Sequence, residues 1–519
     1  MIGTLPVDTS RKPHALHDLL ATIGEFVIVG DANPMISAIE YDSRRIRPGA
    51  LFAALPGSDF DGHAYIGNAV SQGAVTILCE HPVDLPLHVP QIVVADSRAA
   101  LAQIAAAFHA NPSRQMQTIG ITGTDGKTST SYILESILQF AGRTTGVIGT
   151  VGVRIGAERS YDLGHQTTPE SNLVQAFLRE MADSKVDDAI IEATSHGLAM
   201  HRLDGTEFRI AGVTNITHEH LEFHKTIEQY RNAKAMLVER TAALGGVVVL
   251  NADDEGARSM ASAAHGAETH WFSMLDDRAE IHALDVVSSR ESLTFTLTMF
   301  EKSYPVRLPM IGTFNVANAL LASGISHAAG VSSEVIANAL DRPVEIPGRL
   351  RLIDQGQPFT VVVDYAHTPD SLQKILELLR VLHTGRRVII VTGSAGERDA
   401  GKRPMQGNVC ARLADFSVFT SEDPRNEDPE RIIEEIAFGA RDAGGTEGVD
   451  FSRVTDRRQA IADAIAMASP GDCVLLAGKG HETSIIWGFE HRPWNESAVV
   501  METLAARGYS KPSEKHISE

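Results

Sequence analysis

The sequence predicts an α/β protein with three domains, and three observations lead to this prediction. Strand-like runs such as 187–193 (DDAIIEA) and 472–480 (DCVLLAGKG) alternate with amphipathic segments, which is typical of parallel strands buried on both faces. Breaks at Asn111–Pro112 and Ile346–Pro347 are typical of linkers. The length of 519 residues agrees with roughly three domains of about 150 residues each. We therefore expect domains at 1–112, 113–346 and 347–519.

The segment Thr118–Thr130 (TIGITGTDGKTST) is the most informative part of the chain. A β-type run enters a glycine turn, and a helical pattern opens at Thr128. Backbone N–H groups of such a turn surround phosphate oxygens, Lys127 can reach the β- and γ-phosphates, and the Thr128 hydroxyl can bind Mg²⁺. The alternative is an ordinary glycine-rich turn, which the strand–turn–helix context disfavours. We predict a nucleoside triphosphate site.

Each domain has its own order of elements. The first has short β-type runs at 51–55, 75–78 and 91–94, which predict a small α/β domain. The second follows the glycine turn with strand-like runs at 187–193, 211–216 and 245–251, which predict a doubly wound sheet of the P-loop ATPase type. The third is predicted to be Rossmann-like, with strand-like runs at 359–366, 386–393, 414–421 and 472–480 and helical segments at 372–382, 429–443 and 458–468.

Composition excludes several functional classes. The net charge of −20 argues against binding to nucleic acid or to an anionic membrane. Three scattered cysteines, Cys79, Cys410 and Cys473, indicate neither a disulfide framework nor a thiolate zinc site. We find no signal-peptide pattern and no apolar run long enough to span a membrane. A cytoplasmic, monomeric protein is expected.

Polar residues follow the predicted strands of the second domain. Glu192 ends a strand, where its carboxylate can hold Mg²⁺ opposite the phosphate loop, and the alternative is a solvated loop acid. His218, His220 and His224 lie within seven residues, but the HExxH spacing is absent, so contacts to phosphate or Mg²⁺ are favoured over zinc. Lys234 stands on a helical pattern and, taken alone, would be a surface lysine.

Three charged motifs follow strands of the third domain, namely 396–404 (GERDAGKRP), 422–425 (EDPR) and 478–482 (GKGHE). Arginine forks bind carboxylates, and acids bind ammonium groups. The convergence of these charges at one sheet edge is what binding of a zwitterionic amino acid requires, although any single motif could be a solvated rim.

In this order the motifs resemble the Mur ligase family, the ATP-dependent amide-forming ligases of peptidoglycan precursor synthesis. The similarity is greatest to members that add the third residue of the stem peptide, and it covers about residues 36–505. Further matching segments are 41–57 (YDSRRIRPGALFAALPG), 167–169 (TTP), 192–196 (EATSH), 214–223 (TNITHEHLEF), 230–234 (YRNAK), 312–320 (GTFNVANAL), 347–349 (PGR) and 364–372 (DYAHTPDSL).

The resemblance implies a role for individual residues. Catalysis is assigned to Lys127, Glu192, His220 and Lys234. The implied ATP contacts are Gly123, Thr124, Gly126, Lys127, Thr128, Ser129, Asn315, Arg349 and Asp364. The implied ligands of Mg²⁺ are Thr128, Glu192, His220 and Lys234, the last as a carbamate. The implied contacts to UDP-MurNAc-L-Ala-D-Glu are Ser43 and Arg44, at the UDP moiety in the first domain, with Thr167, Thr168, Thr194 and Arg202. The implied amino-acid pocket is formed by Arg398, Asp423, Arg425, Gly478 and Glu482.

Three positions depart from the family pattern. Asp125 stands where asparagine is usual in the phosphate loop, and Met200 replaces a polar residue that contacts substrate. The pocket motif is EDPR where diaminopimelate-adding members usually have DNPR. Arg425 could hold a distal carboxylate, whereas the extra charge of Asp423 would repel it and attract a bare ammonium. Lysine or ornithine is therefore slightly favoured over meso-diaminopimelate as the free diamino acid.

The implied reaction is amide ligation, with ATP and Mg²⁺ as cofactors. The D-Glu carboxylate attacks the γ-phosphate to give an acyl phosphate, and the amine of the diamino acid then displaces phosphate. Catalysis would consist of charge neutralisation and positioning, because both reactants of the first step are anionic. The alternatives are a folylpolyglutamate- or cyanophycin-type ligase, against which the YDSR and TTP segments argue, and a non-catalytic nucleotide-binding protein, against which the intact Lys127, Glu192, His220 and Lys234 argue.

Overall fold

The computed structural model describes residues 2–3, 12–57, 61–156, 159–163, 166–217, 221–289 and 291–510. The chain divides into two compact units. The first contains most residues up to Pro343, and the second contains Val344–Glu519 with the short segments 288–293 and 310–312. In the described part of the chain, no helix is long and apolar enough to cross a membrane.

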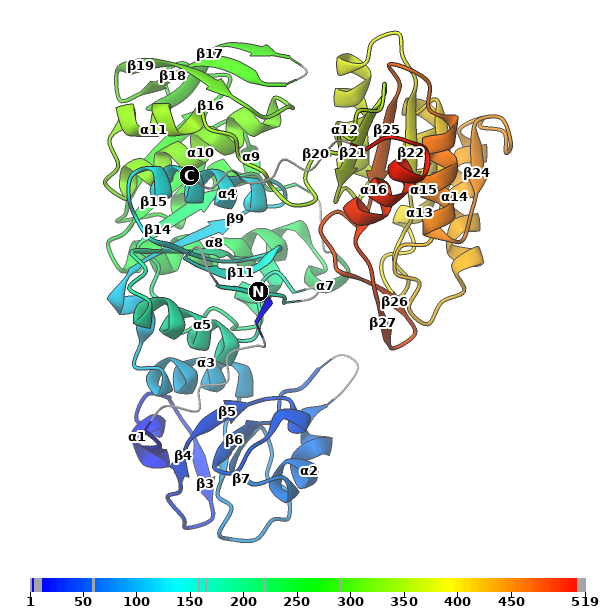
Figure 1. Ribbon diagram of the computed structural model, residues 1–519. Helices are drawn as coiled ribbons and strands as arrows, with labels where there is room; N and C mark the ends of the chain where they lie inside the picture. The colour runs from blue at the N-terminus through cyan, green and yellow to red at the C-terminus, as the bar shows by residue number, and fades with distance from the viewer. Residues whose placement is uncertain are drawn as a thin grey trace, which may run out of the picture. The chain divides into compact units, whose positions relative to one another are not determined.

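The first unit begins with a small sheet, drawn in dark blue in Figure 1. Its strand order is β3 (Val27–Val29), β8 (Gln91–Val93), β7 (Ala74–Cys79), β6 (Ala50–Ala53) and β5 (Ala38–Glu40). The strands are parallel except for β3. The shorter elements are α1 (Leu16–Leu20), α2 (Ile66–Ser71), the 3₁₀ turns η1 (Ser43–Arg45) and η2 (Gly62–Tyr65), and the strand pair β2 (His14–Ala15) and β4 (Met35–Ile36).

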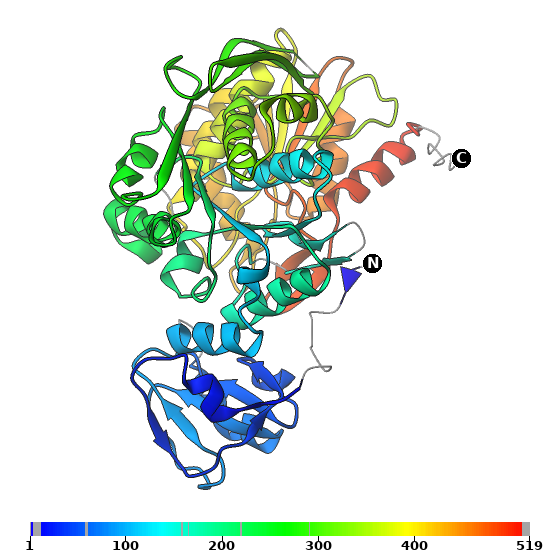
Figure 2. The same ribbon diagram turned by 90° about the vertical axis from the view of Figure 1, so that its left-hand side faces the viewer.

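Helix α3 (Ser97–Phe108) joins the small sheet to the remainder of the first unit. Its apolar side chains Leu101, Ile104 and Phe108 are buried in the core of the small sheet. The same helix packs against α5 (Ser171–Asp183), and it lies between the small sheet and α5 in both views (Figures 1 and 2). The small sheet is thereby held against the larger one.

The described residues of the larger sheet form twelve strands. Their order is β1 (Ile2–Gly3), β12 (Arg159–Tyr161), β11 (Gly152–Ile155), β10 (Thr145–Gly149), β13 (Asp188–Glu192), β9 (Gln117–Thr122), β14 (Ile210–Val213), β15 (Val247–Asn251), β16 (Glu268–Ser273), β17 (Ile281–Ser288), β18 (Leu293–Met299) and β19 (Lys302–Leu308). Strands β10, β13, β9, β14, β15 and β16 are parallel neighbours. The ends of β9 and β13 therefore meet at one edge of the sheet.

Helices cover both faces of this sheet, which confirms the doubly wound prediction. Ala211 and Val213 of β14 face the core formed with α5 and α8 (Ile227–Ala243). A Cβ atom on the intervening Gly212 would contact Leu321 and Ile325 of α10 (Phe314–Ala328), so α10 lies on the opposite face. Helix α10 packs against α4 (Lys127–Phe140). The other helices of this unit are α6 (Ser195–Ala199), α7 (Leu221–His224), α9 (Glu255–Ser259) and α11 (Ser333–Leu340), with 3₁₀ turns η3 (Pro112–Gln115) and η4 (Met260–Ser262).

The second unit, drawn from yellow-green to red in Figure 1, is built on a six-stranded sheet among the described residues. The order is β20 (Arg351–Leu352), β21 (Thr360–Asp364), β25 (Cys473–Ala477), β22 (Val388–Thr392), β23 (Phe416–Phe419) and β24 (Phe451–Arg453). All neighbours are parallel except β20 and β21. The hairpin of β26 (Ser484–Trp487) and β27 (Glu490–Pro493) extends from it.

Alternate residues of strand β21 pack against helices on opposite faces of the second unit's sheet. Val362 of β21 packs with helices α12 (Pro369–Leu382), α13 (Lys402–Leu413) and α14 (Pro429–Asp442). Val361 and Val363 pack instead with α15 (Arg457–Met467) and α16 (Glu496–Ala506). A strand with apolar partners on both sides reads as a continuous apolar run. This arrangement confirms the prediction of an α/β unit of the Rossmann type.

Candidate active site

The phosphate-loop prediction falls on the turn between β9 and α4, at the centre of the larger sheet. Gly126 has a φ of 85°, and a Cβ atom there would lie 2.4 Å from Oδ1 of Asn318, so glycine is required. Helix α4 begins at Lys127, one residue earlier than predicted. The Lys127 Nζ donates hydrogen bonds to the carbonyl oxygens of Gly123 (2.9 Å) and Thr124 (2.7 Å). The lysine and the helix N-terminus thus bring positive charge to one loop.

Glu192, at the end of β13, meets the phosphate loop through Thr128. Its carboxylate is buried, and Oε2 accepts hydrogen bonds from the hydroxyls of Thr128 (2.9 Å) and Thr150 (2.8 Å). Oε1 accepts a bond from the backbone N–H of Thr150 (3.2 Å). A carboxylate and a hydroxyl that meet next to a phosphate loop are hard oxygen donors, so these residues suit Mg²⁺.

Lys234 on α8 is buried, with 2% of its surface exposed. Its Nζ donates to the carbonyl oxygen of Gly123 (2.6 Å) and lies 4.6 Å from the ring centroid of Tyr230. The Tyr230 hydroxyl in turn lies 3.1 Å from Oγ1 of Thr124. Helix α8 therefore contacts the phosphate loop through two side chains, and the expectation that Lys234 alone would be a surface lysine does not hold. His220 and His218 lie outside the described residues.

The loop is also held from its other side by β14 and α10. Asn215 accepts from the Thr124 N–H through its carbonyl oxygen (2.7 Å) and from the Asp125 N–H through Oδ1 (3.0 Å). Asn318 donates to Oδ1 of Asn315 (3.0 Å), and both side chains are buried. Asn318 was not singled out from the sequence, although it stands in the segment 312–320. The structure therefore brings the implied ATP contact Asn315 to the phosphate loop.

The threonines that the resemblance implies as contacts to the muramoyl-dipeptide are linked to Glu192 by hydrogen bonds. The Thr168 hydroxyl donates to the backbone oxygen of Glu192 (2.8 Å) and lies 2.9 Å from Oγ1 of Thr194. Thr167 lies 3.1 Å from the Thr150 hydroxyl. An unbroken set of hydrogen bonds therefore runs from Thr128 to these threonines.

Arg202 belongs to the same group and is oriented by an acid that sequence reasoning missed. Its Nη1 donates to the Thr168 carbonyl (3.0 Å), and its Nε lies 2.9 Å from the buried carboxylate of Glu170. Glu170 also pairs with Arg98 on α3 (2.9 Å). The signal for Glu170 was its place directly after the TTP segment.

Ser43 and Arg44 lie on η1, beside the small sheet. The Ser43 hydroxyl is buried and accepts a bond from Asn68 (3.3 Å). The Arg44 side chain is 85% exposed and pairs with Asp42 (2.7 Å). Arg44 is therefore available to solvent and to a ligand.

One described histidine–carboxylate cluster could hold a metal ion by proximity, namely Asp61, His63 and His81. Nε2 of His63 accepts the backbone N–H of Glu80 (3.0 Å), and Nδ1 lies 2.7 Å from Asp61. Nε2 is therefore unprotonated, and the ring proton resides on Nδ1, the atom that would have to bind the ion. His63 is better explained as a structural residue.

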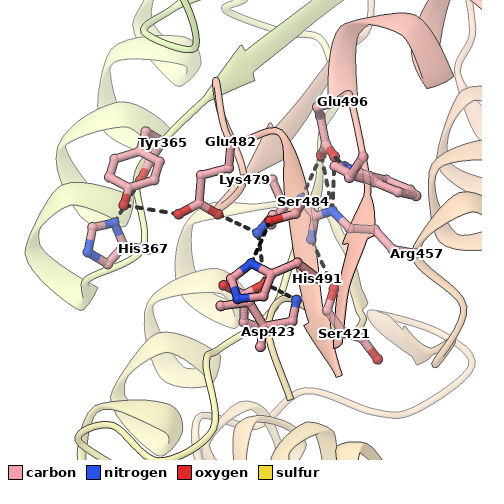
Figure 3. Close-up of polar contacts among 12 residues, drawn as sticks. Tyr365, His367, Ser421, Asp423, Arg457, Lys479, Glu482, Ser484, His491 and Glu496 are labelled. Carbon is pink, nitrogen blue, oxygen red and sulfur yellow. Dashed lines mark hydrogen bonds and ion pairs between the residues drawn. The ribbon is translucent and has the colours of Figure 1, made fainter. Parts of the chain in front are cut away.

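In the second unit, the five residues predicted for the amino-acid pocket follow β22, β23 and β25 along the chain. Lys479 is fully buried, and its Nζ contacts Asp423 (2.8 Å) and Glu482 (Figure 3). Asp423 also accepts the Ile486 N–H (3.0 Å). Asp423 is thus paired with Lys479, which it shares with Glu482, so its negative charge is partly compensated inside the protein. Lys479 was recognised as a strand-end residue but not as this partner.

The other residues of this cluster differ in exposure. The half-buried Arg425 is held through its backbone, which bonds Ile486 (3.0 Å) and Gly488 (2.7 Å). Its Nε is buried with no hydrogen-bond partner among the described residues. Arg398 is exposed, and Gly478 is buried beside Glu422. Burial raises the pKa of Glu422 above its ordinary value.

Arg349 and Asp364, the implied ATP contacts of the second unit, lie near each other. The Arg349 guanidinium stacks over the Tyr365 ring at 4.9 Å. Asp364 ends β21 and accepts the N–H groups of Leu350 and Ala366, each at 2.7 Å. Burial raises the pKa of Asp364, which the positive charge of Arg349 partly opposes.

A doubly wound sheet with a phosphate loop, a buried lysine and a buried acid defines an ATP-using α/β enzyme. Family models match the chain at 35–109 (Mur ligase family, catalytic domain), 121–326 (Mur ligase middle domain) and 348–480 (Mur ligase, glutamate ligase domain). The chain belongs to the Mur ligase family, and it is accordingly an ATP-dependent acid–amino-acid ligase.

Curated relatives and solved structures agree with this placement. The chain is 44% identical over 506 residues to a UDP-N-acetylmuramyl-tripeptide synthetase of Roseiflexus sp., covering 95% of this chain and 99% of the relative. It is 38% identical to a UDP-N-acetylmuramoyl-L-alanyl-D-glutamate–2,6-diaminopimelate ligase of Geobacillus thermodenitrificans, covering 95% and 99%. A solved structure of a ligase with that same name has a TM-score of 0.65 and 27% identity, covering 96% of this chain and 100% of the other.

Proposed function

We propose that the protein joins the amine of a diamino acid to the D-Glu carboxylate of UDP-MurNAc-L-Ala-D-Glu, with conversion of ATP to ADP and phosphate. One observation carries this proposal, namely the set of hydrogen bonds from Thr128 through Glu192 to Thr168 and Thr194. It puts the phosphate loop next to threonines that can hold the acceptor carboxylate. The reactions named for the two curated relatives support the same proposal.

In the first step an oxygen of the D-Glu carboxylate attacks the γ-phosphorus. The bond from that phosphorus to the bridging oxygen of ADP breaks, and an acyl phosphate forms. Lys127 and the N-terminus of α4 would stabilise the charge on the phosphate oxygens. Mg²⁺, held by Thr128, Glu192, His220 and a carbamylated Lys234, would neutralise the same charge when bound.

In the second step the amine attacks the acyl carbon, and the C–O bond to phosphate breaks. Phosphate leaves with the electron pair, and the attacking nitrogen loses a proton as the amide forms. Arg202 and the threonines would hold the acyl group in place during this exchange, which is a matter of positioning. The residues implied for the amino acid are Arg398, Asp423, Arg425, Gly478 and Glu482.

The second unit favours meso-diaminopimelate as the amino acid. The argument for lysine or ornithine depended on an uncompensated Asp423, whereas Lys479 pairs with this carboxylate as well as with Glu482. Arg425 is half-buried, so its guanidinium could donate to a second carboxylate of the amino acid. A charged hydrogen bond of this kind contributes roughly 1.5–3 kcal/mol. The proposed contact with Arg425 therefore favours an amino acid with a carboxylate at its distal end.

The proposal is tested by phosphate release with ATP and UDP-MurNAc-L-Ala-D-Glu, with meso-diaminopimelate, lysine and ornithine compared side by side. We expect release that requires both the nucleotide sugar and meso-diaminopimelate. Release with folate or with no acceptor would indicate a different ligase, and the absence of any release would indicate a non-catalytic protein. Preference for lysine or ornithine would contradict the choice of amino acid alone.

A further inference from the structure

A buried ion pair joins the first residues of α15 and α16. Arg457 is 3% exposed and Glu496 is 1% exposed. Nη2 of Arg457 lies 2.6 Å from Oε1 of Glu496, and Nε lies 3.1 Å from Oε2. The indole N–H of Trp494 also donates to Glu496 (2.6 Å). The guanidinium is thus held in one orientation by a two-pronged contact with an acid that is itself fixed (Figure 3).

The same guanidinium reaches the backbone of two strand ends. Nη2 donates to the carbonyl oxygen of Ala477 (2.8 Å), and Nη1 donates to that of Ser421 (3.3 Å). Ala477 is the last residue of β25, and Ser421 lies just beyond β23. These strands are not neighbours, because β22 lies between them in the sheet. Arg457 therefore bridges two loops that the sheet hydrogen bonds do not join directly.

Both loops carry residues of the proposed amino-acid pocket. Ser421 directly precedes the EDPR segment 422–425, and Ala477 directly precedes the GKGHE segment 478–482. Arg425 has a φ of 52°, a strained conformation for a residue with a side chain, and Gly478 has a φ of 106°, which glycine adopts readily. Lys479 then spans the same gap by contacting Asp423. The separation of the loops sets the distances among all of these side chains.

Stability alone does not explain this ion pair, because replacing a buried pair by apolar residues of similar volume is often neutral or stabilising. Its position, at the carbonyls that precede both motifs, points to placement of the motifs. We propose that Arg457, oriented by Glu496, is a positioning residue that sets the spacing of the 422–425 and 478–482 loops for binding of the amino acid. This inference rests on the proposed function.

The test compares three variants in the phosphate-release assay, with each substrate varied in turn. R457M/E496L removes the ion pair without leaving a buried charge. R457K keeps the positive charge but loses the two-pronged contact of the guanidinium with Glu496. R387M is the matched control, because Arg387 pairs with Asp472 (2.7 Å) where β22 and β25 begin, at the opposite edge of the sheet. We expect the KM for meso-diaminopimelate to rise at least about tenfold in the double variant and less in R457K. The KM values for ATP and the nucleotide sugar should stay within about twofold, as should all KM values of R387M.

The outcomes separate this inference from the function beneath it. If the wild-type protein shows no amino-acid-dependent release, the proposed function fails and this inference fails with it. If the wild type is active and the double variant keeps the amino-acid KM, or raises all three KM values together, positioning by Arg457 is overturned while the function stands. Thermal melting checks that each variant is folded. If the double variant does not fold, R457K is used instead: a rise in the amino-acid KM alone supports the inference, and an unchanged amino-acid KM or a joint rise of all three KM values overturns it.

Discussion

Lys127 and Lys234 donate hydrogen bonds to the same backbone atom, the carbonyl oxygen of Gly123, at 2.9 Å and 2.6 Å. One lysine belongs to the phosphate loop, and the other comes from α8, more than a hundred residues further along the chain. The two contacts fix the Gly123 carbonyl from within the loop and from α8. The positive charge of Lys127 is suited to the phosphate groups of a nucleotide.

We expect Lys127→Ala to abolish ligation while the fold stays intact. The Nζ of Lys127 would stabilise charge on the transferred phosphoryl group, and loss of one such group typically lowers kcat by at least about 100-fold. Phosphate release and circular dichroism measure the two properties. Lys302→Ala, an exposed lysine on β19, is the control. A folded Lys127→Ala protein with near-normal turnover would rule out the phosphate-loop assignment.

Lys234 is predicted to be carbamylated, so that Lys234→Ala loses activity and short carboxylic acids restore part of it. Burial makes a charged amine costly at this position, whereas a carbamate could bind a cation near the loop. Activity should also fall in buffer depleted of carbon dioxide and return with bicarbonate. Lys127→Ala serves as the control that formate or acetate does not restore. Equal response of both variants to carboxylic acids would contradict the prediction.

Arg425→Ala is expected to lower kcat/KM for meso-diaminopimelate by roughly 10- to 100-fold, because one charged hydrogen bond to a carboxylate is lost. Activity with lysine should change much less, since lysine has no distal carboxylate. Arg492→Ala provides a control, because this arginine lies on β27 and pairs with Glu490. An equal loss with both amino acids would show that Arg425 does not contact the distal end.

Glu40 gives a prediction for the pH dependence of stability. Desolvation by burial raises the pKa of Glu40 to about 7, and Arg45 opposes this shift. Between about pH 4.5 and 7 the folded protein therefore binds more protons than the unfolded chain. The stabilising contribution of protonated Glu40 to the free energy of unfolding is fully present below pH 4.5 and is lost as the pH rises through 7. Glu40→Gln should therefore stabilise the protein at pH 8 by roughly 1–3 kcal/mol and have little effect at pH 4.5.

Thermal or urea unfolding of the wild type and Glu40→Gln at several pH values measures this difference. Asp42→Asn is a useful comparison, because the pKa of Asp42 is lowered by its hydrogen bond to Arg44. Its stabilising contribution is lost as the pH falls, so the substitution should have the opposite pH trend. A difference between wild type and Glu40→Gln that does not depend on pH would contradict the assignment.

Local sequence patterns predicted the parallel strands β9, β13, β14 and β15 of the larger sheet and β21, β22, β23 and β25 of the second unit. Strand β25 has apolar neighbours on both faces and appears as an uninterrupted apolar run, and the centre of β13, Ala189–Ile191, does the same. Strands β16 to β19 were not recognised, because part of β17 and β19 is exposed and their runs contain many polar residues. The turn at Gly126 was predictable, since strand, glycine and helix are contiguous.

The sequence by itself determined the fold class, the phosphate loop and the placement of Glu192 at a strand end, because these depend on neighbours along the chain. Tertiary structure alone decided that Lys234 is buried against Gly123, that Lys479 pairs with Asp423 and that Arg457 joins Ser421 to Ala477. Each of these contacts joins residues at least 20 positions apart. Burial and charge compensation depend on which distant segments the folded chain brings together, and no local pattern contains that information.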